Sequence, residues 1–198
     1  MDGMPLVGSD TTDPTLQRVF ERVQGAHGRI NNLYQILANA PTMLEAWIDF
    51  AWTLRADAKS DRALRELMIM RVAQLSEADY EWQAHWPMAL ESGVTEEKLD
   101  GLAEWEQSDR YSAEERLVLM IAEELTVTGA LKPRTLADVR GHFGEEQTVE
   151  LVLTAAFYSC VSRVLLGLGV PMQPTGDQAS GDQASADQSP GDQSTGGR

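Results

Sequence analysis

The chain has 198 residues, of which 42% are hydrophobic and 24% are charged, as is typical of a single soluble globular domain. Its 31 acidic residues outnumber its 16 lysines and arginines, and the formal net charge is −15. This acidic balance disfavours binding to nucleic acid or to an anionic membrane, since both need clustered basic side chains.

Two further features bear on the cellular compartment. The N-terminal MDGMPLVGSD lacks the basic start and the apolar stretch of a secretory signal. No uncharged apolar run approaches the ~18 residues that a membrane-spanning helix needs. We therefore expect a cytoplasmic protein without a membrane segment. Cys160 is the only cysteine, which excludes an intrachain disulfide, and its place in an apolar stripe predicts a buried structural thiol.

Apolar residues recur every three or four positions from about residue 13 to residue 170, a spacing that predicts helices. The first five predicted helices cover residues 14–24, 31–38, 42–56, 61–75 and 77–92. The fourth is apolar almost all round, which indicates a central buried helix. Ser76, with Asp79 three residues later, predicts the start of the fifth helix, and Gly93 predicts its end.

The second half of the chain continues the helical pattern. Thr95 can cap a short sixth helix, and Ser112 with Glu115 predicts the start of a seventh that ends at Gly129. Pro133 is placed for the first turn of an eighth helix that ends near Gly141. The last helix is predicted over residues 145–167. The sequence thus predicts an all-α, compact multi-helix bundle.

The last 25 residues differ from the rest of the chain. From Gly176 onward they repeat GDQAS, GDQAS, ADQSP and GDQST, with no apolar residue larger than alanine. Such a segment cannot bury enough apolar surface to offset the entropy lost on ordering. We therefore expect a flexible N-terminus over residues 1–12, one helical domain over 13–173, and a disordered repeat tail over 174–198.

Several side chains that can handle protons fall between Glu66 and His85. Ala78, Glu81 and His85 are separated by three and then four residues, so they share one face of a helix. A short turn joins this helix to the one that carries Glu66, which favours antiparallel packing and brings Glu66 towards Tyr80 and His85. An imidazole exchanges protons near neutral pH, so the cluster is a candidate acid/base site.

Ordinary structural roles remain open for the same residues. A glutamate and a histidine four positions apart are commonly a solvated surface pair, and Glu66 can simply pair with Arg62 or Arg65. Glu66, Glu81 and His85 offer suitable metal ligands, but no second histidine lies nearby. We therefore predict no metal and no other cofactor.

The stretch from Glu66 to His85 resembles the signature of the carboxymuconolactone decarboxylase / alkyl hydroperoxide reductase D-like family. The peroxidase branch of that family has a glutamate, eleven residues, C-x-Y-C, three residues and a histidine; here Ala78 and Glu81 replace the two cysteines. The resemblance extends through NLY, LANAP and LEAW before the signature, through RELMIMRVAQL, and through AHWPMALESGV. It covers roughly residues 15–172.

The resemblance implies a function for the branch that lacks these thiols. In the family the glutamate, tyrosine and histidine take part in a proton relay, which here implies Glu66, Tyr80 and His85. We expect a cofactor-independent enzyme that decarboxylates, isomerises or hydrolyses a small lactone or keto acid. His85 would be the general acid/base, and Glu81 would tune His85 or contact the substrate.

The surroundings of the cluster suggest a pocket and an assembly. Trp82, Trp86 and Met88 are predicted to line a small substrate pocket, together with the apolar faces of helices 42–56 and 145–167. Family members form homotrimers or hexamers, and five tryptophans suit a subunit interface. Two alternatives remain: a thiol-dependent antioxidant protein of the peroxiredoxin type, which the missing cysteines disfavour, and a non-catalytic oligomeric ligand-binding module.

Overall fold

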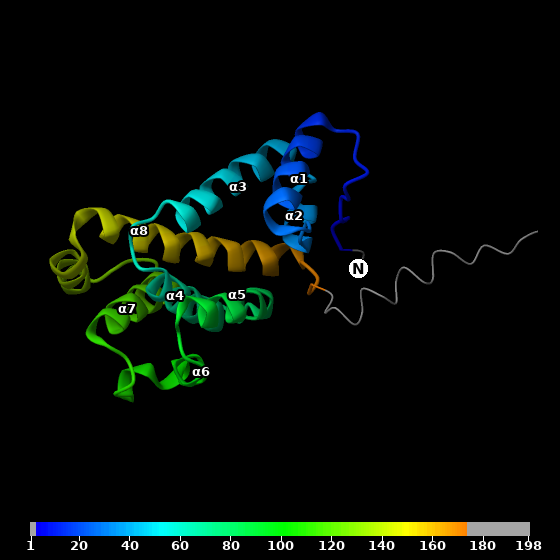
Figure 1. Cartoon of the computed structure of the whole chain (residues 1–198). Helices are drawn as coiled ribbons and strands as arrows, with labels where there is room; N and C mark the ends of the chain where they lie inside the picture. Colours follow the sequence, from blue (N-terminus) through cyan, green and yellow to red (C-terminus); the bar gives the residue numbers. More distant parts are fainter. Residues whose placement is uncertain (1–2, 174–198) are drawn as a thin grey trace, which may run out of the picture.

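A computed structural model describes residues 3–173, and every element within that range is helical (Figure 1). The elements are α1 (Pro14–His27), α2 (Asn32–Leu37), α3 (Pro41–Ala56), α4 (Arg62–Leu75), α5 (Asp79–Ser92), α6 (Glu96–Asp100), the 3-10 helix η1 (Leu102–Gln107), α7 (Ala113–Thr128) and α8 (Pro133–Leu168). The predicted all-α fold is confirmed, and η1 is an addition to it. The expected repeat tail lies outside the described residues.

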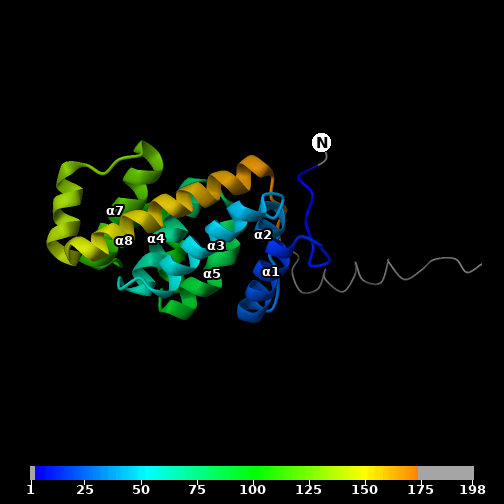
Figure 2. The ribbon, with the colours of Figure 1, turned by 90° about the horizontal axis from the view of Figure 1, so that it is seen from above.

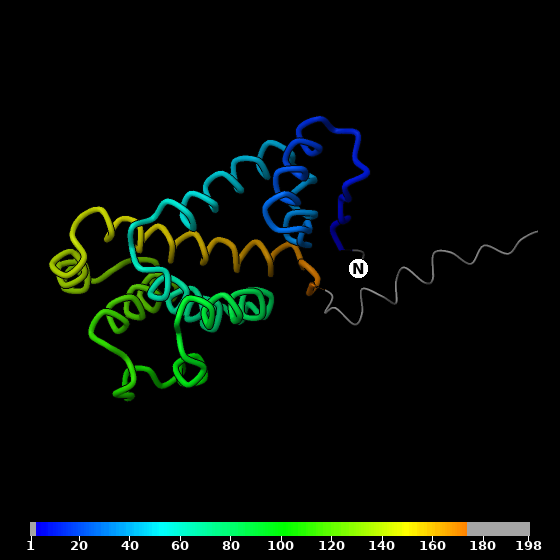
Figure 3. Tube along the Cα trace, in the orientation of Figure 1, coloured from blue at the N-terminus to red at the C-terminus, as the bar shows by residue number. Residues whose placement is uncertain are grey.

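The prediction of a central buried helix is confirmed for α4. This helix packs against α5, α7 and α8, and Leu67, Met68, Met70 and Val72 on its different sides are all fully buried. The remaining helices form two groups around the C-terminal part of α8. Helices α1–α3 lie on one side of it, and α4, α5 and α7 lie on the other (Figure 1, Figure 3). Each helix therefore needs an apolar face only towards this shared centre.

The short link between α4 and α5 corrects one predicted boundary. Ser76 does not begin α5; its backbone N–H donates to the Val72 carbonyl at 3.0 Å and ends α4. Glu77 then takes a positive φ of 53°, and α5 starts after Ala78 without a side-chain cap. A serine can end one helix as well as begin the next, so the sequence pattern alone does not determine whether Ser76 belongs to α4 or to α5. The capping box of Ser112 and Glu115, in contrast, is present as predicted.

Helix α8 contains the two predicted C-terminal helices, joined at a break. At Gly144 the backbone leaves the helical region (φ 75°, ψ 176°), so residues before and after it run in different directions. By length and composition α8 could cross a membrane, but half of its most apolar window is buried in the fold. Core helices of soluble proteins have the same property, so this helix alone does not indicate a membrane protein.

The end of the described chain returns to α2. The Asn32 side chain donates to the carbonyls of Pro171 and Met172, and the Asn32 backbone N–H donates to Gln173 Oε1 at 2.9 Å. From above, α1 and α2 lie across one end of the bundle (Figure 2). Residues from α2, α3, α5, α8 and the C-terminal segment thereby surround one cavity.

Candidate active site

A buried imidazole lies between two carboxylates at the centre of the site. His85 Nδ1 is 2.8 Å from Glu66 Oε2, and His85 Nε2 is 3.2 Å from Glu81 Oε2. Only 6% of Glu66, 4% of Glu81 and 2% of His85 is exposed. The Nδ1 contact is a hydrogen bond, whereas Glu81 Oε2 is buried and accepts no aligned hydrogen bond. The cluster is therefore an interior ion-pair network and not a solvated surface pair.

The charges within this network favour the ionised forms. Burial by itself lowers the pKa of His85, but the hydrogen bond to Glu66, the close contact with Glu81 and the negative charges of both carboxylates outweigh it and raise that pKa above its usual value. For Glu66, burial acts to raise the pKa, but the bond to His85 and the charges of His85, Arg55 and Arg62 lower it. The imidazolium form is thus stabilised at the centre of the site.

Helix geometry explains how the three residues meet. Glu81 and His85 are four residues apart and lie on the buried face of α5. Glu66 reaches them from the neighbouring α4, so the predicted proximity of Glu66 and His85 is present. Arg62 also lies 3.7 Å from Glu66, so the ordinary ion pair exists beside the interior contact. No group of three His, Cys, Asp or Glu side chains in residues 3–173 is arranged to hold a metal ion.

The imidazole opens onto a cavity of about 570 Å³. His85 and Glu81 belong to its lining, whereas Glu66 does not and therefore lies behind His85. Much of the remaining wall is aromatic, from Tyr34, Trp47, Tyr80, Phe157 and Tyr158. Cavities of this size bind small molecules. The arrangement places one acid/base pair against a small, partly apolar space.

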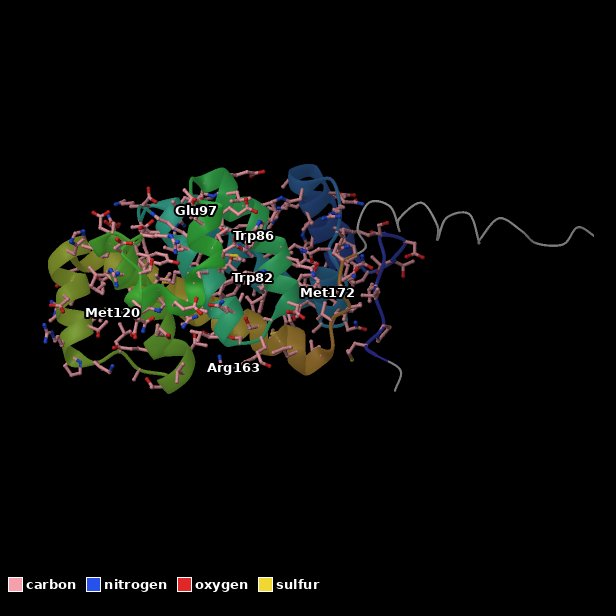
Figure 4. The ribbon with its side chains drawn as sticks, turned by 90° about the horizontal axis from the view of Figure 1, so that it is seen from below. Trp82, Trp86, Glu97, Met120, Arg163 and Met172 are labelled. Atoms are coloured by element: carbon pink, nitrogen blue, oxygen red, sulfur yellow. The ribbon has the colours of Figure 1, made fainter. Side chains whose placement is uncertain are left out.

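Of the three residues predicted to line the pocket, only Met88 does so. Trp82 and Trp86 are partly buried against a second apolar cluster that includes Leu67 and Leu99, and their rings lie 5.4 Å apart. Figure 4 shows the two tryptophans side by side. Each follows Glu81 or His85 by one residue, and one residue turns a helix by about 100°, so both point away from the cavity.

Tyr80 reaches the cavity but not the carboxylate–imidazole cluster. Its hydroxyl donates to Gln173 Oε1 at 3.1 Å, and no hydrogen bond to Glu66 or His85 is present in the described structure. Burial, with a smaller contribution from the charge of Glu81, raises the pKa of Tyr80 to about 12. The phenol therefore keeps its proton at neutral pH, and it lines the cavity with its O–H directed to Gln173.

Two residues that the sequence did not indicate extend the site: Tyr158 contacts His85, and Arg55 contacts Tyr158. The ring of Tyr158 in α8 meets the imidazole edge-on, with centroids 4.9 Å apart, and its hydroxyl accepts a hydrogen bond from Arg55 Nε at 3.1 Å. Burial raises the pKa of Tyr158. A tyrosine in an apolar stripe is usually a core residue, and Arg55 resembles a common helix-end arginine, so neither pattern indicated a site.

Cys160 corrects another expectation. Its side chain is exposed on α8 and it does not line the cavity, so it is not a buried structural thiol. The fully buried face of α8 carries Leu151, Ala155 and Ser162, and at about 100° per residue Cys160 falls on the opposite side of the helix.

Residues 41–124 match the model of the carboxymuconolactone decarboxylase family. The chain is 32% identical to the uncharacterized protein YdfG of Bacillus subtilis (strain 168) over 111 residues, which cover 55% of this chain and 76% of YdfG. The debrominase Bmp8 in its apo form has a similar fold, with a TM-score of 0.73 at 18% identity, over 92% of this chain and 98% of Bmp8. An uncharacterized peroxidase-related protein from Silicibacter sp. TM1040 also has a similar fold, with a TM-score of 0.72 at 16% identity. The match covers 88% of this chain and 93% of that protein.

Proposed function

The chain belongs to the carboxymuconolactone decarboxylase family, and we propose that it is a cofactor-independent enzyme that performs acid/base chemistry on a small organic acid. The observation that carries this proposal is the imidazole of His85, held between Glu66 and Glu81 at the wall of a cavity. A histidine that exchanges protons with a partner carboxylate suits reactions in which a carbanion or enolate forms and is then protonated.

The three residues have different positions and therefore different proposed roles. Glu66 lies behind the ring and holds Nδ1, so it is a positioning residue that fixes the orientation of His85. Glu81 lies at Nε2 and lines the cavity, so a proton on Nε2 can pass to Glu81 or directly to the reacting atom. Glu81 occupies a position where the peroxidase branch has a cysteine. A carboxylate at this position can transfer protons but cannot take part in thiol redox chemistry.

Decarboxylation, isomerisation and hydrolysis of a lactone or keto acid all fit this arrangement. Each develops negative charge on the substrate, which the imidazolium can stabilise, and the phenol of Tyr80 can do the same when its O–H turns from Gln173 to the substrate. A cysteine-to-alanine variant of the debrominase Bmp8 was solved in complex with 2,3,4-tribromopyrrole, a small ring compound, which supports a small-molecule substrate for this fold. Thiol-dependent antioxidant activity is less well supported, because Cys160 lies outside the cavity. We further propose a soluble, cytoplasmic enzyme.

The decisive experiment compares two histidines that each contact a glutamate. His85→Gln should lower kcat/KM for a lactone or keto acid by roughly 10²–10⁴-fold, the usual contribution of general acid/base catalysis. His142 is an exposed matched control, because its Nε2 lies 3.0 Å from Glu114 on the surface, and His142→Gln should leave turnover unchanged. Turnover that survives His85→Gln would remove the acid/base role. Ligand binding without any turnover in the wild type would instead indicate a binding module.

A further inference from the structure

Arg55 has an unusual position for an arginine in this acidic protein. It is in the last turn of α3, is accessible to solvent, and lines the cavity. Its Nε donates to the Tyr158 hydroxyl at 3.1 Å, which fixes the plane of the guanidinium. Within residues 3–173 its two terminal amino groups have no hydrogen-bond or ion-pair partner. A fixed guanidinium with two open donors is suited to bind a carboxylate through paired hydrogen bonds.

The nearby glutamates do not occupy these donors. Glu66 and Glu81 are close enough for their charges to influence Arg55 or be influenced by it, but each is within ion-pair distance of His85 instead. His85 contributes one positive charge and Arg62, 3.7 Å from Glu66, contributes a second, so the two carboxylates have cationic partners other than Arg55. Its charge remains available to a ligand.

The charges of the cavity wall also oppose those of the whole chain. The protein carries 31 acidic residues against 16 lysines and arginines, yet the wall contains Arg29, Arg55 and the ion-paired His85 against the single acidic residue Glu81. A concave site lined by one sign of charge concentrates ligands of the opposite sign. The charges of the cavity wall therefore favour an anionic ligand.

The wall beside Arg55 is formed by flat rings. Trp47 and Phe157 lie with centroids 4.9 Å apart, and Phe157 and Tyr158 lie 5.6 Å apart, so three aromatic rings are contiguous next to the guanidinium. Aromatic side chains stack or meet edge-on with other flat rings more favourably than with bulky saturated groups. The wall favours a planar ligand.

From these contacts we infer that Arg55 binds the carboxylate of a small aromatic or similarly planar unsaturated acid, whose ring lies against Trp47 and Phe157. This inference rests on the acid/base function proposed above, since the bound acid would be the substrate of the Glu81–His85 pair. Because Arg55 stabilises the ionised carboxylate, that carboxylate anchors the ligand, and the reaction takes place elsewhere on it, by isomerisation, hydrolysis or loss of a second carboxylate. The reacting atom then faces Glu81.

Calorimetric titration of the full chain with benzoate and with its neutral analogue benzamide tests the inference. Wild type should bind benzoate roughly tenfold or more tightly than benzamide, as expected for a charge-assisted hydrogen-bonded pair. Arg55→Gln should reduce the affinity for benzoate to that for benzamide, and Arg55→Lys should restore only part of it because an ammonium lacks the paired donors. Arg134→Gln, at an arginine whose side chain is 92% exposed, removes the same charge elsewhere and should change nothing.

Equal affinities for benzoate and benzamide in the wild type would overturn the anchor, as would undiminished benzoate binding by folded Arg55→Gln. Should Arg55→Gln fail to fold, the comparison of benzoate with benzamide in the wild type and the benzoate affinity of Arg55→Lys still test whether Arg55 binds the carboxylate. Binding is measured without turnover, so the two proposals fail separately. Benzoate binding that depends on Arg55, without catalysis of any acid, would remove only the enzyme function. Turnover that depends on His85 without benzoate binding would remove only the anchor.

Discussion

At the scale of single residues, His85 has a carboxylate against each ring nitrogen, so its protonation depends on Glu66 and Glu81. The neutral variant Glu66→Gln removes a charge that raises the pKa of His85 and replaces a charge-assisted hydrogen bond with a weaker neutral one. We expect that pKa to fall in the variant. The three histidines of the chain can be followed by NMR against pH, with His27 and His142 as internal controls. An unchanged His85 titration would contradict the network.

The same pair predicts how stability depends on pH. Because folding raises the pKa of His85, its contribution to the free energy of unfolding is fully present below the unfolded value of about 6.5. It is lost as the pH rises through the higher, folded pKa. Glu66→Gln should therefore flatten this part of the stability curve in denaturant unfolding, and a wild-type curve that rises over this range would have the wrong sign.

The residue scale also shows what the sequence could reveal. Glu66, Glu81 and His85 were predicted together because helix spacing and one short turn determine their proximity. Tyr158 and Arg55 depend on the approach of α8 and α3, which are distant in sequence, and no local pattern specifies such a contact. Trp82 and Trp86 were misplaced because one residue of offset turns a side chain to the other side of a helix.

At the scale of elements, apolar periodicity predicted the α-helices, but their ends depended on individual residues. The side chains of Ser112 and Glu115 each accept a hydrogen bond from the other residue's backbone N–H, so that helix start could be predicted from the sequence. Ser76 has the same residue type but completes the hydrogen bonding of α4. Residue type alone did not decide which of two adjacent helices Ser76 belonged to. The break within α8 was predicted, and the structure places it at Gly144.

Gly144 gives a prediction at this scale. Its φ of 75° and ψ of 176° fall in a region that is essentially restricted to glycine, and a Cβ there would meet nothing within 4 Å. The cost of Gly144→Ala is therefore conformational, about 1–3 kcal/mol of unfolding free energy. Gly141→Ala is the matched control, because Gly141 has no positive φ and is equally uncrowded. It should stabilise the helix by about 0.4–1 kcal/mol. Denaturant unfolding would measure both, and equal effects would contradict the expected break.

At the scale of the whole molecule, the exposed apolar residues indicate where the chain could associate with copies of itself. Of the five tryptophans, Trp105 is buried and the other four are partly buried, so each packs at least in part within the chain. Helix α8 instead exposes Val149 and Leu153, followed on the same face by Ala156 and Cys160. Exposed apolar residues that align along one helix face are typical of an interaction surface. The homotrimer or hexamer inferred from the family therefore has a candidate surface on α8.

Light scattering of the purified chain should give the mass of a trimer or hexamer. Leu153→Glu would place a charge where Leu153, 40% exposed, would be buried in the assembly. A buried unpaired charge costs several kcal/mol, enough to shift such an equilibrium towards the monomer. Leu136→Glu is the control, since Leu136 is 38% exposed on the other side of the Gly144 break and should leave the mass unchanged. A monomeric wild type would exclude self-association under those conditions. An assembly that survives Leu153→Glu would place the interface on another face of the bundle.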